Sequence, residues 1–590
     1  MNRQLSAHAT TLENLKKEAK RWLKALRAND REARERLRRA FPNHPAQPTL
    51  RDVQRALALE RGLEGWTALK TQLEAGALES SRKAELADLF LENACADPVL
   101  AGGPGAHSGR SRAALRILAH APEIALHSIH TAVVCGDLEL VKRILKERPE
   151  AATEPGGPLR RRDIPERQKQ WTPLLHLCYG RLPTPAAGDN AVAIARLLMD
   201  SGADPNDHFE VGSPQNRYTA LCGVAGEGED DAPPHPQREA LMELLLDRGA
   251  EPYDTQLFYN LHFHGDILWM MQLIYDAAIR AGRQADWSDP HWSMINMGGL
   301  GLGSRYFLNI AVTNNDLELA EWLLTHGASA NAGPPQHSKG SGRTLYQEAM
   351  RRGFTIMAEL LERFGATPSA PEPLAGEQAF TAACLRLDHE AVSSYLVEHP
   401  EYLRSPAALF EAASRDRVDV VEFLIGLGVS IEIEDQFKQR PLHVAASKNS
   451  LRVAAFLIER GAEIDPVESN WGATPMGFAN YGQKTAMIEL LGRVSTNIWE
   501  LTSGGQVERL RELLAAQPAL AKAGGETNTP LMWLPDDEAR ALEIIKLLIA
   551  HGADPAIRNN EGKTAADCAE RRGLYAAADL LKQIAGASYR

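Results

Sequence analysis

The stretch RPLHVAASKNSLRVAAFLIERGAEID, residues 440–465, decides the fold. Proline is tolerated in the first turn of a helix, because the N–H groups of that turn have no helical partner. Aliphatic side chains then recur at helical spacing, as at Leu451, Ala454 and Ile458. The Gly-Ala pair at 461–462 predicts the end of a second helix, since glycine readily adopts the left-handed conformation that terminates helices. The stretch therefore predicts two short helices followed by a turn.

The same pattern recurs along most of the chain. Further openings are TPLLHLCY (172–179), TALCGVAG (219–226), TPMGFANY (474–481) and TAADCAER (564–571). Helix ends with Gly-Ala or a close variant are LLMDSGADPN (197–206), LLLDRGAEP (244–252), LLTHGASAN (323–331), LLERFGATP (360–368), LIGLGVSIE (424–432) and LLIAHGADP (547–555). In degenerate units a proline replaces this pair, as in LKERPE (145–150), LVEHPE (396–401) and LAAQPA (514–519). The step from Gly428 to Gly461 is 33 residues. A fixed period of this size indicates a repeat architecture.

These two motifs, in this order and at this period, resemble the ankyrin repeat, whose consensus opens with Thr-Pro-Leu-His and closes its second helix before Gly-Ala. The resemblance covers roughly residues 110–590. It implies an all-α, right-handed ankyrin-repeat solenoid of about 13 repeats, in which each helix pair covers the apolar face of its neighbour. Second helices are expected to begin near Leu138, Val192, Glu239, Ile267, Leu317, Thr355, Glu390, Val418, Leu451, Thr485, Val507, Ala541 and Leu574.

The repeats divide into two regions of different regularity. Residues 113–375 are predicted to be ankyrin repeats with long insertions, whereas residues 376–590 are regular repeats that end in a C-terminal cap repeat. The insertions are expected at 153–170, 181–190, 207–217, 227–237, 280–304 and 332–342.

Residues 1–98 predict a helical N-terminal cap domain, and the glycine-rich residues 99–112 a linker. Leu15, Trp22 and Leu26 belong to one apolar helix stripe, whose opposite face is basic. Thr49 and Asp52 form a capping-box pattern for a later helix. The arrangement resembles the helical region that precedes the repeats in many bacterial ankyrin proteins. The basic face is expected to be solvated, with an acidic partner, a membrane or nucleic acid as alternatives.

Composition narrows the classes of function. The chain of 590 residues carries a net charge of −12, but residues 1–75 hold 16 Lys and Arg against 9 Asp and Glu. The remaining chain is therefore acidic, which argues against general nucleic-acid binding. Six cysteines without a CxxC pair favour a reducing compartment, and no signal peptide or membrane span is recognisable. We expect a cytoplasmic protein with no membrane association.

Candidate chemical sites are weak. His262, His264, Asp266, Asp289 and His291 lie close in sequence, but the two histidines are expected on a helix, where residues two apart point in different directions. The segment GGLGLGS (298–304) lacks the spacing of a phosphate-binding loop. No nucleophile signature is present. The sequence thus predicts neither catalysis nor a cofactor nor a metal.

The insertion at 280–304 is the strongest candidate for recognition, because tryptophan and methionine are enriched in interface cores. The alternative is that its aromatic side chains cover an irregular repeat. The candidate partner-binding residues in and around it are Trp269, Asp286, Trp287, Asp289, His291, Trp292, Met294, Arg305 and Tyr306.

The sequence therefore predicts a non-enzymatic ankyrin-repeat scaffold that mediates protein–protein interaction through its concave groove and the insertions of repeats 2–6. Two alternatives stay open: a metal-dependent regulator or enzyme that uses residues 262–305, and a secreted effector that acts in a host. The identity of the partner and the oligomeric state are not predicted.

Overall fold

The computed structural model describes residues 12–98, 103–158, 170–211, 213–226, 228, 232–261, 267–284, 303–331, 343–369, 374–525 and 527–587. The chain divides into two compact units, Met1–Asp88 and Leu89–Arg590, with the division inside helix α4.

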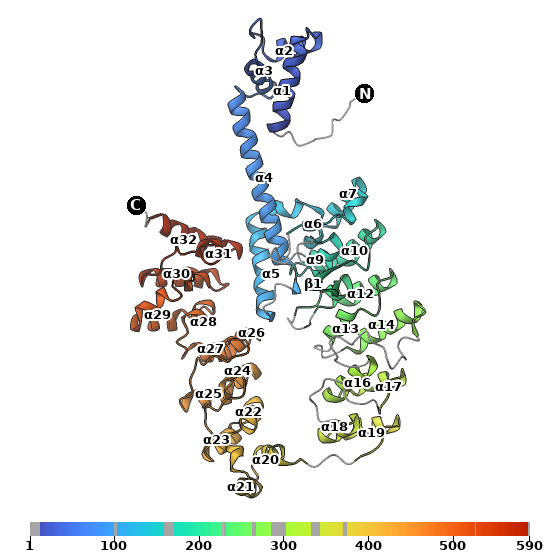
Figure 1. The fold of residues 1–590 in the computed structure, drawn as a ribbon, viewed down its shortest axis with the longest axis vertical. Helices are drawn as coiled ribbons and strands as arrows, with labels where there is room; N and C mark the ends of the chain where they lie inside the picture. The colour runs from blue at the N-terminus through green and yellow to red at the C-terminus, as the bar shows by residue number, and fades with distance from the viewer. Residues whose placement is uncertain are drawn as a thin grey trace. The chain divides into compact units, whose positions relative to one another are not determined.

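Unit 1 is a small helical domain (Figure 1). It contains α1 (Leu12–Arg27), α2 (Arg31–Ala40), α3 (Leu50–Leu59) and the first part of α4 (Trp66–Ala94). Its core is built on the predicted apolar stripe, with Trp22 buried and its indole N–H donating to the Ala33 carbonyl at 3.0 Å. The predicted capping box is present, since Thr49 and Asp52 exchange side chain–backbone hydrogen bonds at the start of α3.

Unit 2 consists of α5, a run of paired helices, short 3₁₀ helices and one β-hairpin. The elements before residue 286 are α5 (Gly103–His120), η2 (Pro122–Leu126), α6 (Ile129–Cys135), α7 (Leu138–Glu147), η3 (Pro149–Ala152), α8 (Pro173–Tyr179), α9 (Pro185–Asp189), α10 (Ala191–Asp200), β1 (His208–Val211), β2 (Ser213–Thr219), α11 (Ala220–Ala225), α12 (Arg238–Asp247), α13 (Thr255–Leu261) and α14 (Leu268–Arg280). Those that follow are α16 (Gly303–Asn314), α17 (Leu317–Thr325), α18 (Leu345–Arg351), α19 (Thr355–Arg363), α20 (Gly376–Leu385), α21 (His389–Glu398), η6 (Pro400–Arg404), α22 (Ala407–Ser414), α23 (Val418–Gly426), α24 (Pro441–Lys448), α25 (Leu451–Glu459), α26 (Pro475–Tyr481), α27 (Thr485–Gly492), α28 (Ile498–Ser503), α29 (Val507–Ala516), η7 (Pro518–Lys522), η8 (Pro530–Met532), α30 (Glu538–Ala550), α31 (Ala565–Arg571) and α32 (Tyr575–Ala587).

The helix boundaries follow the sequence motifs. The hydroxyl of each threonine in the opening motif accepts the N–H three residues ahead, as at Thr172, Thr219, Thr474 and Thr564. A helix begins at or within three residues of every predicted second-helix start: Leu138, Ala191, Arg238, Leu268, Leu317, Thr355, His389, Val418, Leu451, Thr485, Val507, Glu538 and Tyr575. These helix positions could therefore be read from the spacing of the two motifs.

Neighbouring pairs pack through small and aliphatic residues. Helix α24 contacts its own partner α25 and also α22 and α26 on either side. Ala412, Ala413, Ala445 and Ala446 are fully buried between these helices, and their small side chains let the backbones approach. Each pair thus completes its core only with its neighbours.

Three features differ from the sequence prediction or refine it. The described chain is mostly helical but not wholly so, because the insertion at 207–217 forms the antiparallel hairpin β1–β2. Phe209 of this hairpin is buried and stacks on Trp171 at 4.7 Å between ring centroids, which anchors the insertion. Residues 103–112, predicted as linker, begin helix α5 instead. The proline-containing units end in the 3₁₀ helices η3, η6 and η7, with proline in the first turn.

Candidate functional site: the fingers and groove of the C-terminal repeats

Most of the predicted partner-binding residues lie outside the described residues. This applies to Asp286, Trp287, Asp289, His291, Trp292 and Met294, and also to His262, His264 and Asp266 of the weak metal candidate. Arg305 and Tyr306 lie on helix α16. Trp269 lies half-buried on α14, with the Arg238 guanidinium 4.9 Å from the centre of its ring. The role of the 280–304 insertion therefore stays a prediction.

Two negative findings apply to the part of the chain that the structure describes. No three potential metal ligands gather there in a group. None of the described helices combines the length and apolar character needed to cross a membrane.

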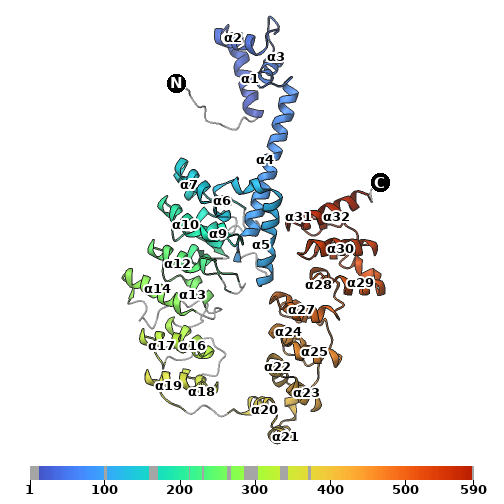
Figure 2. The same cartoon turned by 180° about the vertical axis from the view of Figure 1, so that it is seen from behind.

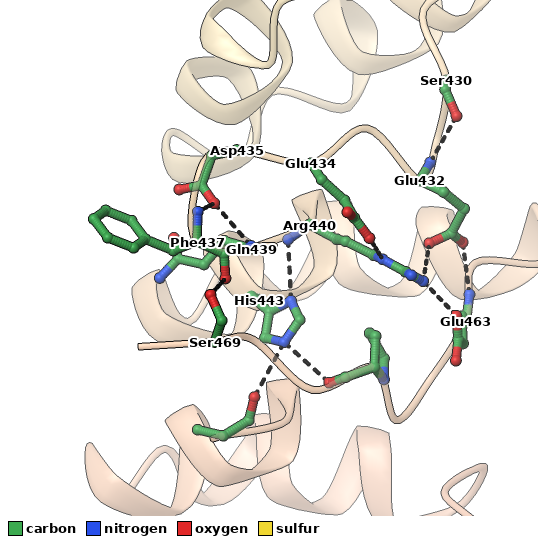
Figure 3. A network of polar contacts seen from close by, with 12 residues as sticks. Ser430, Glu432, Glu434, Asp435, Phe437, Gln439, Arg440, His443, Glu463 and Ser469 are labelled. Carbon is green, nitrogen blue, oxygen red and sulfur yellow. Dashed lines mark hydrogen bonds and ion pairs between the residues drawn. The ribbon is translucent and has the colours of Figure 1, made fainter. Parts of the chain in front are cut away.

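The turns that connect one repeat to the next are here called fingers. The finger between α23 and α24 and the finger between α25 and α26 carry the network of polar contacts in Figure 3. Arg440 stands at the start of α24 and pairs with Glu432 and Glu434 of its own finger, both at 2.9 Å, and with Glu463 of the next. Burial alone would lower the pKa of Arg440, but its hydrogen bonds to Glu463 and Glu434 and the charge of Glu432 raise it overall. One guanidinium thus holds two successive fingers together.

His443 of the opening RPLH motif ties the same two fingers from inside. Its Nδ1 accepts the N–H of Arg440 at 3.1 Å, and its Nε2 lies 3.1 Å from the Pro466 carbonyl and 3.3 Å from that of Ala473 (Figure 3). Burial lowers the pKa of His443, so the ring is neutral and donates from Nε2. The histidine of the motif is therefore structural.

Carboxylates fix the turn at the tip of each finger. Asp435 accepts the N–H groups of Phe437 and Gln439, each at 2.8 Å. Glu468 accepts three backbone N–H groups of the next finger, including that of Trp471 at 2.7 Å. These backbone hydrogen bonds lower the pKa of Glu468 against the raising effect of its burial, so it stays ionised.

The finger tips held by these hydrogen bonds present large aromatic side chains to solvent. Phe437 is 43% exposed and Trp471 is 71% exposed. The N–H of Ser469 donates to the Phe437 carbonyl at 2.8 Å, which links the two tips directly. The Trp471 ring also meets Phe478 edge to face at 5.8 Å between centroids, so one side of it is already supported by its own repeat.

A groove of about 760 Å³ lies further along the same series of repeats. Its lining combines apolar residues, amides and charges: Ser503, Thr527, Asn528, Met532, Trp533, Leu534, Asp536, Asn559, Asn560, Glu561, Cys568 and Arg572. Trp533 is 51% exposed, and its indole N–H donates to Asn528 at 3.2 Å. The volume is within the usual range of protein ligand sites.

Sequence reasoning missed the finger aromatics, although a signal for them exists. Phe437 stands three residues before Arg440, and Trp471 stands three residues before Thr474 of the next opening motif. Aromatic residues in the same register of consecutive repeats must lie on the same side of neighbouring fingers.

Comparison with known proteins agrees with the repeat architecture. The family described as "Ankyrin repeats (3 copies)" matches residues 409–502, and the family "Ankyrin repeat" matches residues 527–560. The chain is similar to human "Ankyrin repeat and SOCS box protein 16", with 26% identity over 182 residues, 28% of this chain and 40% of that protein. It is also similar to rice (Oryza sativa subsp. japonica) "Potassium channel KOR2", with 30% identity over 80 residues, 14% of this chain and 11% of that protein. The matches thus span less than half of either relative.

Proposed function

Because this chain is an ankyrin repeat protein, and ankyrin repeats are protein–protein interaction modules, we propose that it is a non-enzymatic scaffold whose fingers and groove bind a protein partner. The proposal includes an array of about 13 repeats in residues 113–590, a second contact surface formed by the insertions of repeats 2–6, and a cytoplasmic location. Its partner class is protein rather than nucleic acid or membrane.

The observation that carries the proposal is the pair of exposed aromatics on pinned finger tips. Tryptophan is the residue most enriched among binding hot spots, where truncation costs about 2 kcal/mol or more. The Asp435 and Glu468 hydrogen bonds fix the backbone under Phe437 and Trp471 before any partner arrives. Such preorganisation reduces the entropy lost on binding, so more of the contact energy appears as affinity.

Charge supports a protein partner over nucleic acid. Glu432, Glu434 and Glu463 surround a single guanidinium, that of Arg440, so this part of the finger surface is negative. Phosphate backbones would be repelled there. The proposed cytoplasmic location rests on the six scattered cysteines, which form no CxxC pair in the sequence, a pattern that favours a reducing compartment.

The test is capture of partners from a lysate of the source organism by the immobilised full-length chain, with quantitative mass spectrometry. We expect at least one protein to be enriched on the wild type and strongly reduced on the variant Phe437→Ala/Trp471→Ala. The matched control is Val397→Ala, because Val397 is 85% exposed but lies on second helix α21 rather than on a finger. Equal capture by the wild type and the aromatic variant would reject this binding surface.

A further inference from the structure

Helix α5 contacts both ends of unit 2. One of its faces is apolar and packs on the first repeats: Ala114 and Ile117 are fully buried. Helix α5 also contacts η2, and the hydroxyl of Ser111 donates to the Arg181 carbonyl at 3.2 Å. This side of α5 is an ordinary part of the core.

The opposite stripe of α5 contacts the C-terminal repeats, more than 370 residues away in sequence. Gln483 donates to the Ser108 hydroxyl at 3.2 Å, and Arg112 pairs with Asp536 at 2.6 Å. Arg116 donates to the Arg572 carbonyl at 2.7 Å. One turn later the ring of His120 stacks on Tyr575 with 3.9 Å between centroids. Contacts every fourth residue place these side chains on one face of α5. Helix α5 runs beside α31 in Figure 2.

Two glycines allow this close approach. A Cβ atom on Gly573 would lie 2.9 Å from the Cβ of Arg116 and 3.2 Å from the Ala113 carbonyl. A Cβ atom on Gly109 would lie 3.0 Å from the Asp536 carboxylate. The two surfaces therefore fit each other in detail rather than merely touching.

Charge, rather than apolar burial, dominates this contact. Asp536 lies 2.6 Å from Arg112, 2.7 Å from Arg572 and 3.7 Å from Arg116. Burial raises the pKa of Asp536, but the arginines lower it by more, so the carboxylate stays ionised. Next to this contact but outside α5, Arg571 pairs with Glu92 at the end of α4 at 2.9 Å. Partly exposed ion pairs of this kind weaken as the salt concentration rises.

The contact shares residues with the groove described above. Asp536 and Arg572 both line the groove, whose other carboxylate is Glu561. A ligand that brings a guanidinium to Asp536 would therefore compete with Arg112. Nearby, Trp533 and Met532 offer apolar surface, and the Asn528 and Asn560 amides are suited to the backbone of a bound segment.

We propose that α5 is a clasp: an internal ligand of the C-terminal repeats that a protein segment carrying an arginine displaces when it binds the groove. This inference rests on the proposed protein-binding function and adds the chemistry of the partner and the regulation of its access. The apparent association constant of the partner is its intrinsic association constant multiplied by the fraction of molecules in which the clasp is open.

Small-angle X-ray scattering of the full chain tests whether the clasp opens. In the Asp536→Arg variant the new side chain would face three arginines, so we expect the radius of gyration of this variant to exceed that of the wild type. The Arg112→Ala variant should show a smaller increase. Glu422→Arg is the matched control, since it breaks the 2.8 Å pair with Arg460 between adjacent repeats. An unchanged radius in both clasp variants overturns the proposal. The Arg112 side chain is 52% exposed, so the Arg112→Ala variant should stay folded. It therefore still tests the clasp if the Asp536→Arg variant does not fold.

A labelled synthetic peptide of residues 103–120 tests whether α5 acts as a ligand. The internal helix competes with the peptide in the wild type, so the variant Arg112→Ala/Arg116→Ala should bind it at least about tenfold more tightly. Adding Asp536→Arg to that variant should abolish binding. Absence of binding to the opened double variant, or equal binding with and without Asp536, overturns the ligand role. Neither measurement needs the partner, so these outcomes are separate from those of the capture experiment.

Discussion

Replacement of His443 by alanine should loosen two fingers at once. The substitution removes the acceptor of the Arg440 N–H and the donor to the Pro466 and Ala473 carbonyls. An unsatisfied buried polar group costs about 1–3 kcal/mol. The lost edge-to-face contact with Phe478, at 5.8 Å between centroids, adds about 1 kcal/mol. We therefore expect the repeats around α24 and α26 to lose about 2–4 kcal/mol of stability.

Hydrogen exchange followed by mass spectrometry measures this loss locally, which matters because repeats unfold in part. Peptides from residues 428–481 should exchange at least about twentyfold faster in His443→Ala, since each 1.4 kcal/mol is a factor of ten. His399→Ala is the control, because the His399 side chain is 42% exposed and contacts Glu401 and Tyr402, which are close to it in sequence. Unchanged exchange in the His443 variant would refute the structural role assigned to the motif histidine.

Three further predictions follow from other sites. Burial raises the pKa of Glu500 from 4.5 to about 7, so its charged form opposes folding above about pH 4.5. Glu500→Gln should therefore raise the free energy of unfolding, measured by urea denaturation, by about 1–3 kcal/mol at pH 8. At pH 4 the same substitution should leave it unchanged. Gly573 has φ +67°, so Gly573→Ala should lower the stability of the last repeat by about 1–2 kcal/mol and weaken the α5 contact. Gly562→Ala is the control: Gly562 has φ +74° but open space around it, so this change should add strain without affecting α5. Equal rates of hydrogen exchange in α5 of the two variants would contradict this. Deletion of 281–303 should abolish partner capture while far-UV circular dichroism stays largely helical; capture at undiminished affinity would exclude the insertion as a recognition element.

The regular part of the fold could be predicted because its causes are local. Threonine caps, a proline in the first turn and glycine after the second helix each act within a few residues. Leu451 and Thr485, for example, begin helices at the predicted positions. The chemistry of these short motifs, repeated many times, was sufficient to position the helices.

The features that were missed depend on distant contacts. Glycine-rich residues before Ser111 predict a linker, yet Ala114 and Ile117 bury against the first repeats and so favour a helix. Likewise, hairpin β1–β2 is held by the stacking of Phe209 on Trp171, 38 positions earlier in the chain. Tertiary packing overrides local propensity in both cases.

The candidate site also contains both features with local causes and features that depend on distant contacts. The buried role of His443 and the exposure of Trp471 follow from repeat register, which a single sequence contains. The pairing of Arg112 with Asp536 does not, because nothing local to either residue indicates the other. Sequence reasoning could therefore have found the finger aromatics, but it had no route to the α5 clasp.

The affinity of the captured partner for the Phe437→Ala/Trp471→Ala variant tests the central claim most directly. Isothermal titration calorimetry with the purified partner should show a dissociation constant raised by at least about thirtyfold, as expected for loss of a tryptophan hot spot of about 2 kcal/mol. Val397→Ala should bind like the wild type. A dissociation constant for the aromatic variant within about twofold of wild type, a change too small for any hot spot, would contradict the account.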